Sequence, residues 1–313
     1  MRVIDREEVA RKLTYDVCIP LVRQAMIALS RGETRQLLRS IIPLADGHMF
    51  GIMPGALGER GVFGAKLISV FPDNFSKGIQ SHQGVVVLFD GATGAPVCVA
   101  HAGEITAIRT AAASAVATDA LAAPAASRLA VLGYGEQAAT HIRAIRQVRR
   151  LSRISVWGRD AGRAAAFAER IGSETGVATV AAKDVEACVA EAQIICTVTN
   201  AAEPVLLGRW VPPGAHLNLV GSSFAGPTEV DHDVVTVSRF IADSREGVLA
   251  QGAEFLKAKA AGLVGDDHVV GEIGQVLAGD IPGRQSPDQI TVYKSLGHIV
   301  QDLAAAQALY EAK

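Results

Sequence analysis

The sequence predicts an α/β protein in which a doubly wound parallel sheet is joined to an α+β domain. A glycine-rich turn at Gly133–Ala138 joins an apolar strand to a helix, and strands and helices alternate from there to about residue 242. Before residue 122, β-rich segments lie between helices without that alternation. A regular alternation indicates a parallel sheet with covering helices. The chain has 313 residues, which exceeds the roughly 250–300 residues at which single cores stop growing, so we expect two domains.

The first part of the chain is expected to begin and end with helices around a set of strands. Asp5 followed by Glu8 has the form of a capping box that opens a short helix. A second helix is expected from about Asp16 to Ser30, and an alanine-rich helix from about Glu104 to Leu121. Strands are expected between them at 49–53, 62–71, 85–89 and 96–100, with the turn Asp90–Gly94 closing a hairpin.

The second part is expected to form the parallel sheet. The segment at 122–126 contains a proline and breaks the alanine-rich helix, so we place a domain boundary there. A last helix is expected at about 291–311, packed back on the first domain. The predicted domains are therefore 1–121 plus 291–313, and 122–290. The expected strands are 129–132, 154–157, 178–181, 194–199, 217–220 and 240–242.

The composition is that of an ordinary soluble globular protein, and we expect it in the cytoplasm. The formal net charge is −2, so we expect neither a nucleic-acid partner nor a membrane partner. The N-terminus does not have the pattern of a signal peptide, and no apolar run reaches the roughly 20 residues needed to span a bilayer. The four cysteines are scattered without metal-ligand spacing, and we expect no metal site.

The turn after the strand at 129–132 predicts a dinucleotide site. It reads G-x-G-x-x-A with a strand before and a helix after, the context that this motif requires in a Rossmann-type domain. Gly133 permits the tight turn, Gly135 allows close approach of the pyrophosphate, and Ala138 allows the helix to pack closely on the strand. Glu136 and Gln137 open the helix whose free N–H groups face phosphate. A glycine turn in some other α/β protein is the alternative.

The end of the second strand bears on the choice of cofactor. An NAD site usually offers an acid here for the ribose 2′-OH, but this strand ends in Trp157-Gly158-Arg159. A guanidinium suits a 2′-phosphate, so we favour NADP(H), with NAD(H) as the alternative. Arg159 could instead mark a solvated helix start with Asp160 as its N-cap. Thr110 and Thr197 are further candidates for cofactor contact.

Basic side chains in apolar surroundings mark a candidate substrate site in the first domain. Lys66 interrupts an apolar strand, and Arg109 is a lone charge on the alanine-rich helix. Such cations are costly to bury unless they are paired, and they could converge on an anionic substrate. His82 precedes the next strand. Each has a plainer alternative: an exposed strand lysine, an arginine satisfied by a carbonyl or an acid, or a histidine that orients a loop.

Several of these segments together resemble the ornithine cyclodeaminase/mu-crystallin family, and the resemblance extends over essentially the whole chain. It implies that the domain at 1–121 plus 291–313 binds substrate and forms a dimer, and that 122–290 is the nucleotide-binding domain. It also implies an active site between the two domains, in which two arginines and a lysine bind the substrate carboxylate. Arg39, Lys66 and Arg109 match those positions, Arg39 with the least distinctive surroundings. The segments that carry the resemblance are 66–72, 82–86, 103–113, 133–138, 242–246, 271–279 and 290–297.

One departure from the family pattern bears on the reaction. Ser223 stands where the cyclodeaminases and related alanine dehydrogenases carry a catalytic Asp, and Pro227 replaces a basic residue. The ketimine reductases resemble this chain in having Ser in this region. The resemblance therefore implies NADPH-dependent reduction of Δ1-pyrroline-2-carboxylate to L-proline, of Δ1-piperideine-2-carboxylate to L-pipecolate, or of both. Ornithine cyclodeamination, alanine dehydrogenase activity and non-catalytic crystallin-like ligand binding remain alternatives.

Two residues are candidates for the chemical step. Lys66 lies beside two arginines in this interpretation, and their like charges should lower its pKa and make it an acid–base group near neutral pH. Ser223 could donate or relay a hydrogen bond. His82 is a lesser candidate for the same site.

Overall fold

The computed structural model describes residues 1–59 and 61–312, which form two compact units. The first unit consists of Met1–Thr110 together with His298–Lys313, and the second of Ala111–Gly297. Helix α3 (Ala102–Leu121) begins in the first unit and continues into the second. Within the described part of the chain, no helix is both long and apolar enough to cross a membrane.

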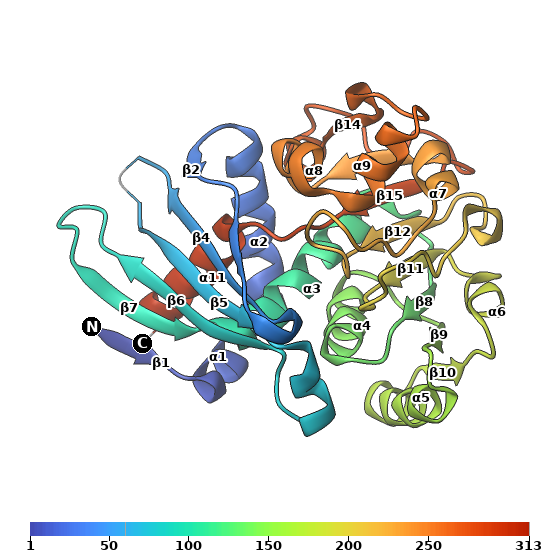
Figure 1. Cartoon of the computed structure of the whole chain (residues 1–313), viewed down its shortest axis with the longest axis horizontal. Coiled ribbons are helices and arrows are strands. Elements are labelled where there is room, and N and C mark those ends of the chain that lie inside the picture. The colour runs from blue at the N-terminus through green and yellow to red at the C-terminus, as the bar shows by residue number, and fades with distance from the viewer. Residues whose placement is uncertain (60, 313) are drawn as a thin grey trace. The chain divides into compact units, whose positions relative to one another are not determined.

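The first unit is built on a mixed seven-stranded sheet, in which β1 runs parallel to β7 and the other neighbours are antiparallel. The strand order is β1-β7-β6-β5-β4-β2, and β3 pairs with β4. Figure 1 shows α2 and α11 beside this sheet. The strands are β1 (Arg2–Ile4), β2 (Thr34–Gln36), β3 (Ser40–Pro43), β4 (Met49–Leu57), β5 (Phe63–Val70), β6 (His82–Phe89) and β7 (Pro96–His101). The helices are α1 (Arg6–Lys12), α2 (Tyr15–Ser30) and α11 (Ile299–Glu311).

Helix α11 packs closely on the sheet, which explains why the C-terminal segment folds with the N-terminal residues. It contacts β4, β5, β6 and α2. At Gly55 of β4, a Cβ atom would approach the Ile299 side chain to 2.8 Å, so only glycine permits this distance between strand and helix. Val300, Leu303 and Ala306 are all buried in the packing.

Two local predictions for this unit are confirmed. The backbone N–H of Glu8 donates to the Asp5 carboxylate at 2.8 Å, so Asp5 caps α1. The reciprocal half of the predicted capping box is not formed, because the Glu8 carboxylate pairs with Arg2 and Lys12. Strands β6 and β7 pair antiparallel across the turn that follows Asp90, whose side chain accepts from the N–H groups of Ala92 and Thr93. Gly94 completes this turn with a φ of +71°.

The second unit is a doubly wound parallel sheet, as predicted. Its eight strands have the order β10-β9-β8-β11-β12-β15-β13-β14, and every neighbouring pair is parallel. The strands are β8 (Arg128–Leu132), β9 (Arg153–Trp157), β10 (Ala178–Ala181), β11 (Ile194–Thr197), β12 (His216–Leu219), β13 (Arg239–Ala242), β14 (Val269–Glu272) and β15 (Thr291–Lys294). The helices are α4 (Glu136–Val148), α5 (Ala161–Thr175), α6 (Val185–Val189), α7 (His232–Val237), α8 (Arg245–Gln251), α9 (Ala253–Ala260) and α10 (Ile273–Ala278).

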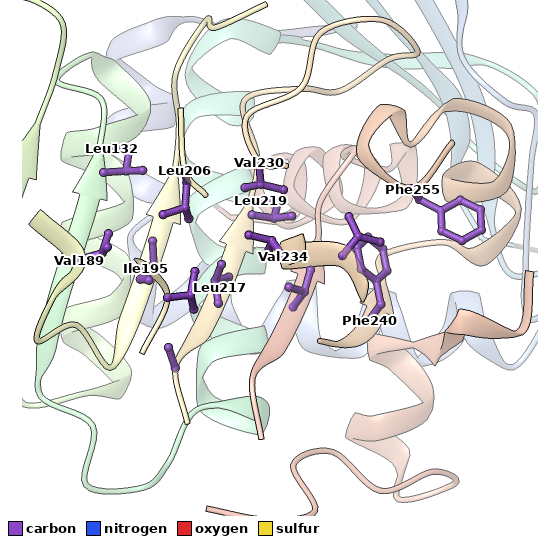
Figure 2. Packing of buried hydrophobic residues seen from close by; sticks show 14 of the residues in the cluster. Leu132, Val189, Ile195, Leu206, Leu217, Leu219, Val230, Val234, Phe240 and Phe255 are labelled. Carbon is purple, nitrogen blue, oxygen red and sulfur yellow. The ribbon is translucent and has the colours of Figure 1, made fainter. Parts of the chain in front are cut away.

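Helices cover both faces of this sheet because successive strand residues point to opposite sides. In β8, Leu129 and Val131 pack with residues of α4 and α5. Ala130 and Leu132 belong to a second core cluster with residues of α6, α7, α8 and α9. Figure 2 shows part of that second cluster, in which Phe240 of β13 lies beside Phe255 of α9.

The structure differs from the sequence-based expectation near the C-terminus. Residues 291–311 are not one helix: Thr291–Lys294 form β15, between β12 and β13, and α11 begins only at Ile299. The segment at 291–294 contains β-branched and aromatic residues, which favour a strand, and Gly297 (φ +80°) separates it from the helix. Residues 291–297 therefore belong to the second unit. The other boundary lies between Thr110 and Ala111, inside α3 rather than after Leu121.

Candidate functional site

The glycine turn between β8 and α4 has the geometry of a dinucleotide cradle. Gly133 has a φ of +126°, and a Cβ there would come within 2.7 Å of the Val198 carbonyl oxygen. Its N–H donates to the Trp157 carbonyl at 2.8 Å, which ties the turn to β9. Gly135 is the N-cap of α4 and supplies no side-chain hydrogen bond, so a side chain does not block the first N–H groups of this helix. These features fit a bound pyrophosphate.

The helix behind the turn lies close to the sheet. Ala138 of α4 is fully buried in the cluster with Val131 of β8. Glu136 and Gln137 form the first turn of the helix, as the motif predicts. The small residue at position 138 therefore sets the distance between helix and strand.

At the end of β9 an aromatic ring lies over a glycine, and one arginine lies over that ring. A Cβ on Gly158 would come within 2.1 Å of the Tyr134 ring, so Tyr134 lies directly over this glycine. The Arg163 guanidinium lies 5.1 Å from the centre of the same ring. Asp160 caps α5 by accepting from the N–H of Arg163 at 2.9 Å. Asp160 is thus the N-cap that the sequence offered as an alternative, and Arg159 lies directly before this cap.

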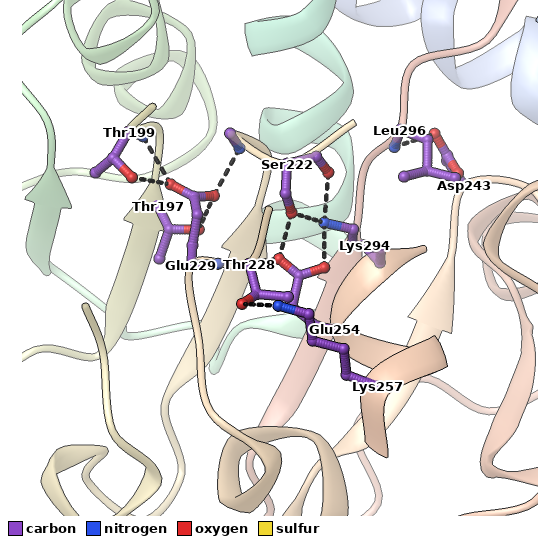
Figure 3. Close-up of polar contacts among 11 residues, drawn as sticks. Thr197, Thr199, Ser222, Thr228, Glu229, Asp243, Glu254, Lys257, Lys294 and Leu296 are labelled. Carbon is purple, nitrogen blue, oxygen red and sulfur yellow. Dashed lines mark hydrogen bonds and ion pairs between the residues drawn. The ribbon is translucent and has the colours of Figure 1, made fainter. Parts of the chain in front are cut away.

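The segments that follow the carboxyl ends of β11 and β12 are bonded to a buried carboxylate that the sequence analysis did not identify. Glu229 is fully buried and accepts from the hydroxyl groups of Thr197 and Thr199 at 2.7 Å each. It also accepts from the N–H of Thr199 at 2.7 Å and of Gly221 at 2.6 Å. Burial raises the pKa of this carboxyl. The Thr197 hydroxyl, a predicted cofactor contact, is thus bonded within the protein (Figure 3).

A second buried group holds the turn that carries Ser223. The Lys294 ammonium donates to the Ser222 carbonyl at 2.7 Å and to its hydroxyl at 2.6 Å, and it pairs with the Glu254 carboxylate at 2.7 Å. The Ser222 hydroxyl in turn donates to Glu254 (Figure 3). Ser223 itself is half-buried. The turn is therefore bonded to Glu229 through Gly221 and to Lys294 and Glu254 through Ser222.

In the first unit, three charged side chains from distant segments form one buried cluster. The Lys66 ammonium of β5 lies 3.1 Å from each carboxylate oxygen of Asp302 on α11. The Arg109 guanidinium of α3 donates through Nε to Asp302 Oδ1, also at 3.1 Å. None of the three is more than 3% exposed. The structure thus brings the predicted Lys66 and Arg109 together, and it adds Asp302, which sequence reasoning missed.

Neutral side chains complete the surroundings of this cluster. Gln301 accepts from the second arm of Arg109 at 2.8 Å, and the Thr106 hydroxyl lies 3.4 Å from the Lys66 ammonium. The amide of Gln301 donates to the Met26 sulfur of α2 at 3.2 Å. Thr110, a predicted cofactor contact that follows Arg109 on α3, is buried.

The charges of the cluster shift one another's pKa values. Burial, the Arg109 charge and the Arg39 charge together lower the pKa of Lys66 to about 7, although Asp302 raises it. The direction predicted from the sequence is therefore correct, but burial contributes more than either arginine alone. Burial raises the pKa of Asp302, yet Arg109 and Lys66 outweigh it, so the net shift is downward and Asp302 stays ionised.

The remaining predicted residues lie close to this cluster. Burial and the charges of Lys66, Arg109 and Arg39 lower the pKa of His82 to about 4. His82 is therefore neutral near pH 7, and its Nδ1 lies 3.0 Å from the Ser81 hydroxyl. Arg39 is half-buried ahead of β3 and acts electrostatically on both Lys66 and His82. The structure thus brings Arg39, Lys66, His82 and Arg109 into one region of the first unit.

Comparison with known proteins identifies the family. A family model described as "Ornithine cyclodeaminase/mu-crystallin family" matches residues 2–313. The chain belongs to this family. The resemblance seen in the sequence is confirmed, and so is the fold class.

Three relatives illustrate the likeness. The ketimine reductase mu-crystallin of Mus musculus is 33% identical, with 98% of this chain and 96% of the relative covered. The structure of Thermococcus litoralis Δ1-pyrroline-2-carboxylate reductase in complex with NADH and L-proline is 30% identical, covers 99% of this chain and 97% of its own, and superposes with a TM-score of 0.95. An archaeal alanine dehydrogenase dimer with bound NAD is 26% identical, covers 99% and 94%, and gives a TM-score of 0.91.

Proposed function

We propose that this protein is an NADPH-dependent ketimine reductase. It reduces the C=N bond of a cyclic imino acid, Δ1-pyrroline-2-carboxylate to L-proline, Δ1-piperideine-2-carboxylate to L-pipecolate, or both. The reaction class rests on membership of a family that includes imino-acid reductases of the same full length. The observation that carries the substrate assignment is the buried cluster with an excess of positive charge, Lys66 and Arg109 with Arg39 nearby.

The cations of the first unit bind the carboxylate of the substrate. Lys66, Arg109 and Arg39 carry three positive charges when Lys66 is protonated, and Asp302 balances one of them. A substrate carboxylate therefore enters a region with a surplus of positive charge and a low dielectric, where charge-assisted hydrogen bonds are strong. The planar Arg109 group fixes its orientation.

Lys66 also supplies the proton that the reaction needs. With a pKa lowered to about 7, the ammonium can release a proton to the imine nitrogen and regain it from solvent near neutral pH. His82 is too weak a base to be charged at that pH. Its neutral ring orients the segment before β6.

The second unit holds the cofactor. The Gly133 turn binds the pyrophosphate, and Arg159, with Arg163 stacked on Tyr134, binds the 2′-phosphate of the adenosine ribose, which gives the preference for NADPH over NADH. NADPH, when bound, supplies the hydride that the C=N carbon accepts. Ser223, on its anchored turn, offers a hydroxyl that donates a hydrogen bond during the reaction.

The residue at position 223 also argues against the main rival reaction. Ornithine cyclisation needs a base near the distal amine of the substrate, and Ser223 is not a base at neutral pH. Buried carboxylates do lie near this turn, but Glu229 and Glu254 are bonded within the protein. Reduction of an imine requires no such base.

We also propose that the protein is a homodimer. The segment that leads into and out of edge strand β3 carries apolar side chains in contact with solvent, and an apolar patch of this kind usually marks an interface. The alanine dehydrogenase to which this chain is similar is a dimer. The exposed residues are Leu37, Leu38, Ile41, Ile42 and Leu44.

The function is tested by the loss of NADPH absorbance with each of the two cyclic imines, with NADH and L-ornithine run in parallel. We expect oxidation that depends on the imine, faster with NADPH than with NADH, and no ammonia from ornithine. Lys66→Met should abolish turnover while NADPH still binds, and Lys77→Met, at an exposed lysine, is the matched control. Silence with both imines, combined with tight NADPH binding, would favour a crystallin-like binding protein. Ammonia released from ornithine would favour a cyclodeaminase instead.

A further inference from the structure

The carboxylate of Asp302 is the centre of the cluster in the first unit, yet binding of an anionic substrate does not require it. It is fully buried, and both of its oxygens accept from Lys66, while Oδ1 also accepts from Arg109. A negative charge in this place repels a substrate carboxylate. Its presence between the two cations therefore calls for a different role.

The position of Asp302 is fixed by the packing of α11. Its neighbour Gln301 is also fully buried and bonds to Arg109 and Met26, and Leu303 is buried on its other side. The carboxylate consequently cannot swing out of the cluster when a ligand enters. It reaches Lys66 across 236 positions of the sequence and Arg109 across 193.

We propose that Asp302 is the positioning residue of this site: it holds the Lys66 ammonium beside Arg109 and keeps it protonated until the imine binds. This inference rests on the proposed function of the site. Without an anion in contact, Lys66 would be a buried amine beside two guanidinium groups, a situation that favours its neutral form. A neutral amine could neither attract the carboxylate nor donate a proton.

The groups that surround Lys66 support this assignment. Of the three charged groups that act on its titration, Arg109 and Arg39 favour the neutral amine, and Asp302 alone favours the ammonium. The titratable neighbours His82 on β6 and His298 at the start of α11 have pKa values lowered to about 4, chiefly by burial, and are neutral near pH 7. Asp302 thus decides the protonation of Lys66 at the pH of the reaction.

The proton balance of the step follows. The Lys66 ammonium breaks one N–H bond and transfers that proton to the imine nitrogen, and the C=N carbon accepts hydride from the reduced cofactor. The lysine is left as a neutral amine paired with Asp302, and it takes a proton from solvent before the next cycle. Asp302 stays ionised throughout, because its net pKa shift is downward.

The test is the pH dependence of kcat/KM for Asp302→Asn, which keeps the shape of the side chain but removes its charge. In the wild type, kcat/KM should fall as the pH rises through the pKa of Lys66, at about 7. Removal of the anion lowers that pKa, so in D302N the falling limb should move to lower pH by at least about one unit. The free imine titrates too, but equally for every variant. A merely structural role would lower activity at all pH values and leave the limb in place, and that result would overturn the proposal.

Two further measurements keep the inference testable. The double variant Gln301→Glu/Asp302→Asn moves the carboxylate one position along α11. Residue 301 accepts a hydrogen bond from Arg109 and, unlike Asp302, is not bonded to Lys66. The net charge of the cluster is restored, which supports folding if D302N alone unfolds, and the limb should still lie at lower pH than in the wild type. The affinity for L-proline, measured with NADP⁺ present, should weaken as the pH rises. In each variant this should occur over the pH range in which kcat/KM falls. An unshifted limb in both variants contradicts the role of Asp302, whereas a wild type that oxidises no NADPH with either imine contradicts the proposed function itself.

Discussion

The ion pair that holds the Ser223 turn is buried, so removal of one partner alone should destabilise the second unit strongly. Lys294 and Glu254 are at most 1% exposed, and their charged atoms lie 2.7 Å apart. Lys294→Met removes the ammonium at nearly constant shape. Glu254 then keeps the Ser222 hydroxyl and the Glu229 N–H at 3.3 Å as partners, but its charge is buried without a cation.

The expected loss of stability is large because one charge remains behind. Breaking a buried pair by removing one partner costs about 3–5 kcal/mol. For a domain of this size each kcal/mol lowers Tm by roughly 2–4 °C, so Lys294→Met should lower the melting temperature by roughly 6–20 °C. Glu254→Gln should have an effect of similar size. The double variant Lys294→Met/Glu254→Gln removes both charges of this pair, so it should be no less stable than the worse single variant.

The assay is urea and thermal unfolding of the wild type, both single variants and the double variant. The dissociation constant for NADPH is then measured for each protein. Lys257→Met is the matched control, because Lys257 is an exposed lysine on the same helix as Glu254 and makes one long hydrogen bond of 3.4 Å to Thr228 (Figure 3). It should change the free energy of unfolding by no more than about 0.5 kcal/mol. Additive losses in the double variant, or a Lys294→Met loss no larger than that of the control, would refute the reasoning.

The other predictions concern the cofactor, acid stability and assembly. Arg159→Ala should raise KM for NADPH about tenfold or more, because one charge-assisted hydrogen bond is lost, and should leave KM for NADH unchanged. An equal change for both cofactors would contradict a role of Arg159 at the 2′-phosphate. Burial lowers the pKa of His141 to about 4 and of His216 to about 3. Below about pH 6.5 these histidines are protonated in the unfolded chain but remain neutral in the folded chain. The free energy of unfolding should therefore fall by up to about 1.4 kcal/mol per histidine per pH unit as the pH drops from 6.5 to 4. Melting temperatures measured from pH 7.5 to 5 check this, and a flat profile would show that these rings are not buried neutral. If the proposed dimer uses this face, the wild type should be dimeric in light scattering and Ile42→Asp monomeric, and a variant that stays dimeric would place the interface elsewhere.

Local signals in the sequence were enough to predict most of the fold. The Asp5 cap, the Asp90 turn and the Gly133 turn each depend on contacts within a few residues, so their patterns are visible in the sequence. The strand at Thr291–Lys294 was missed for the opposite reason. It completes the second sheet only by pairing with β12 and β13, strands that lie far from it in the sequence.

The site was predictable only in part, and the missing part consists of acids. Lys66 and Arg109 stood out because a cation on an apolar element is unusual. Asp302 did not, since a polar pair at Gln301-Asp302 looks like the solvated face of any helix. Burial of that pair is decided by α11 packing on β4, β5 and β6, which no short sequence window contains.

Three of the buried carboxylates share a property that separates them from residues that bind ligands. Asp302, Glu229 and Glu254 each accept hydrogen bonds from groups of the protein itself, and each bonds to a residue next to, or among, the candidates for substrate or cofactor contact. An acid used in this way adds no contact to a substrate, but it determines where a neighbouring cation, hydroxyl or backbone N–H points. Mutation of such an acid should therefore change the pH dependence or the stability of the protein more than its choice of substrate. We therefore expect the neutral side chains near Lys66 to set the size and shape of the proposed imine substrate. Exchanges between relatives of different specificity are best directed at those side chains.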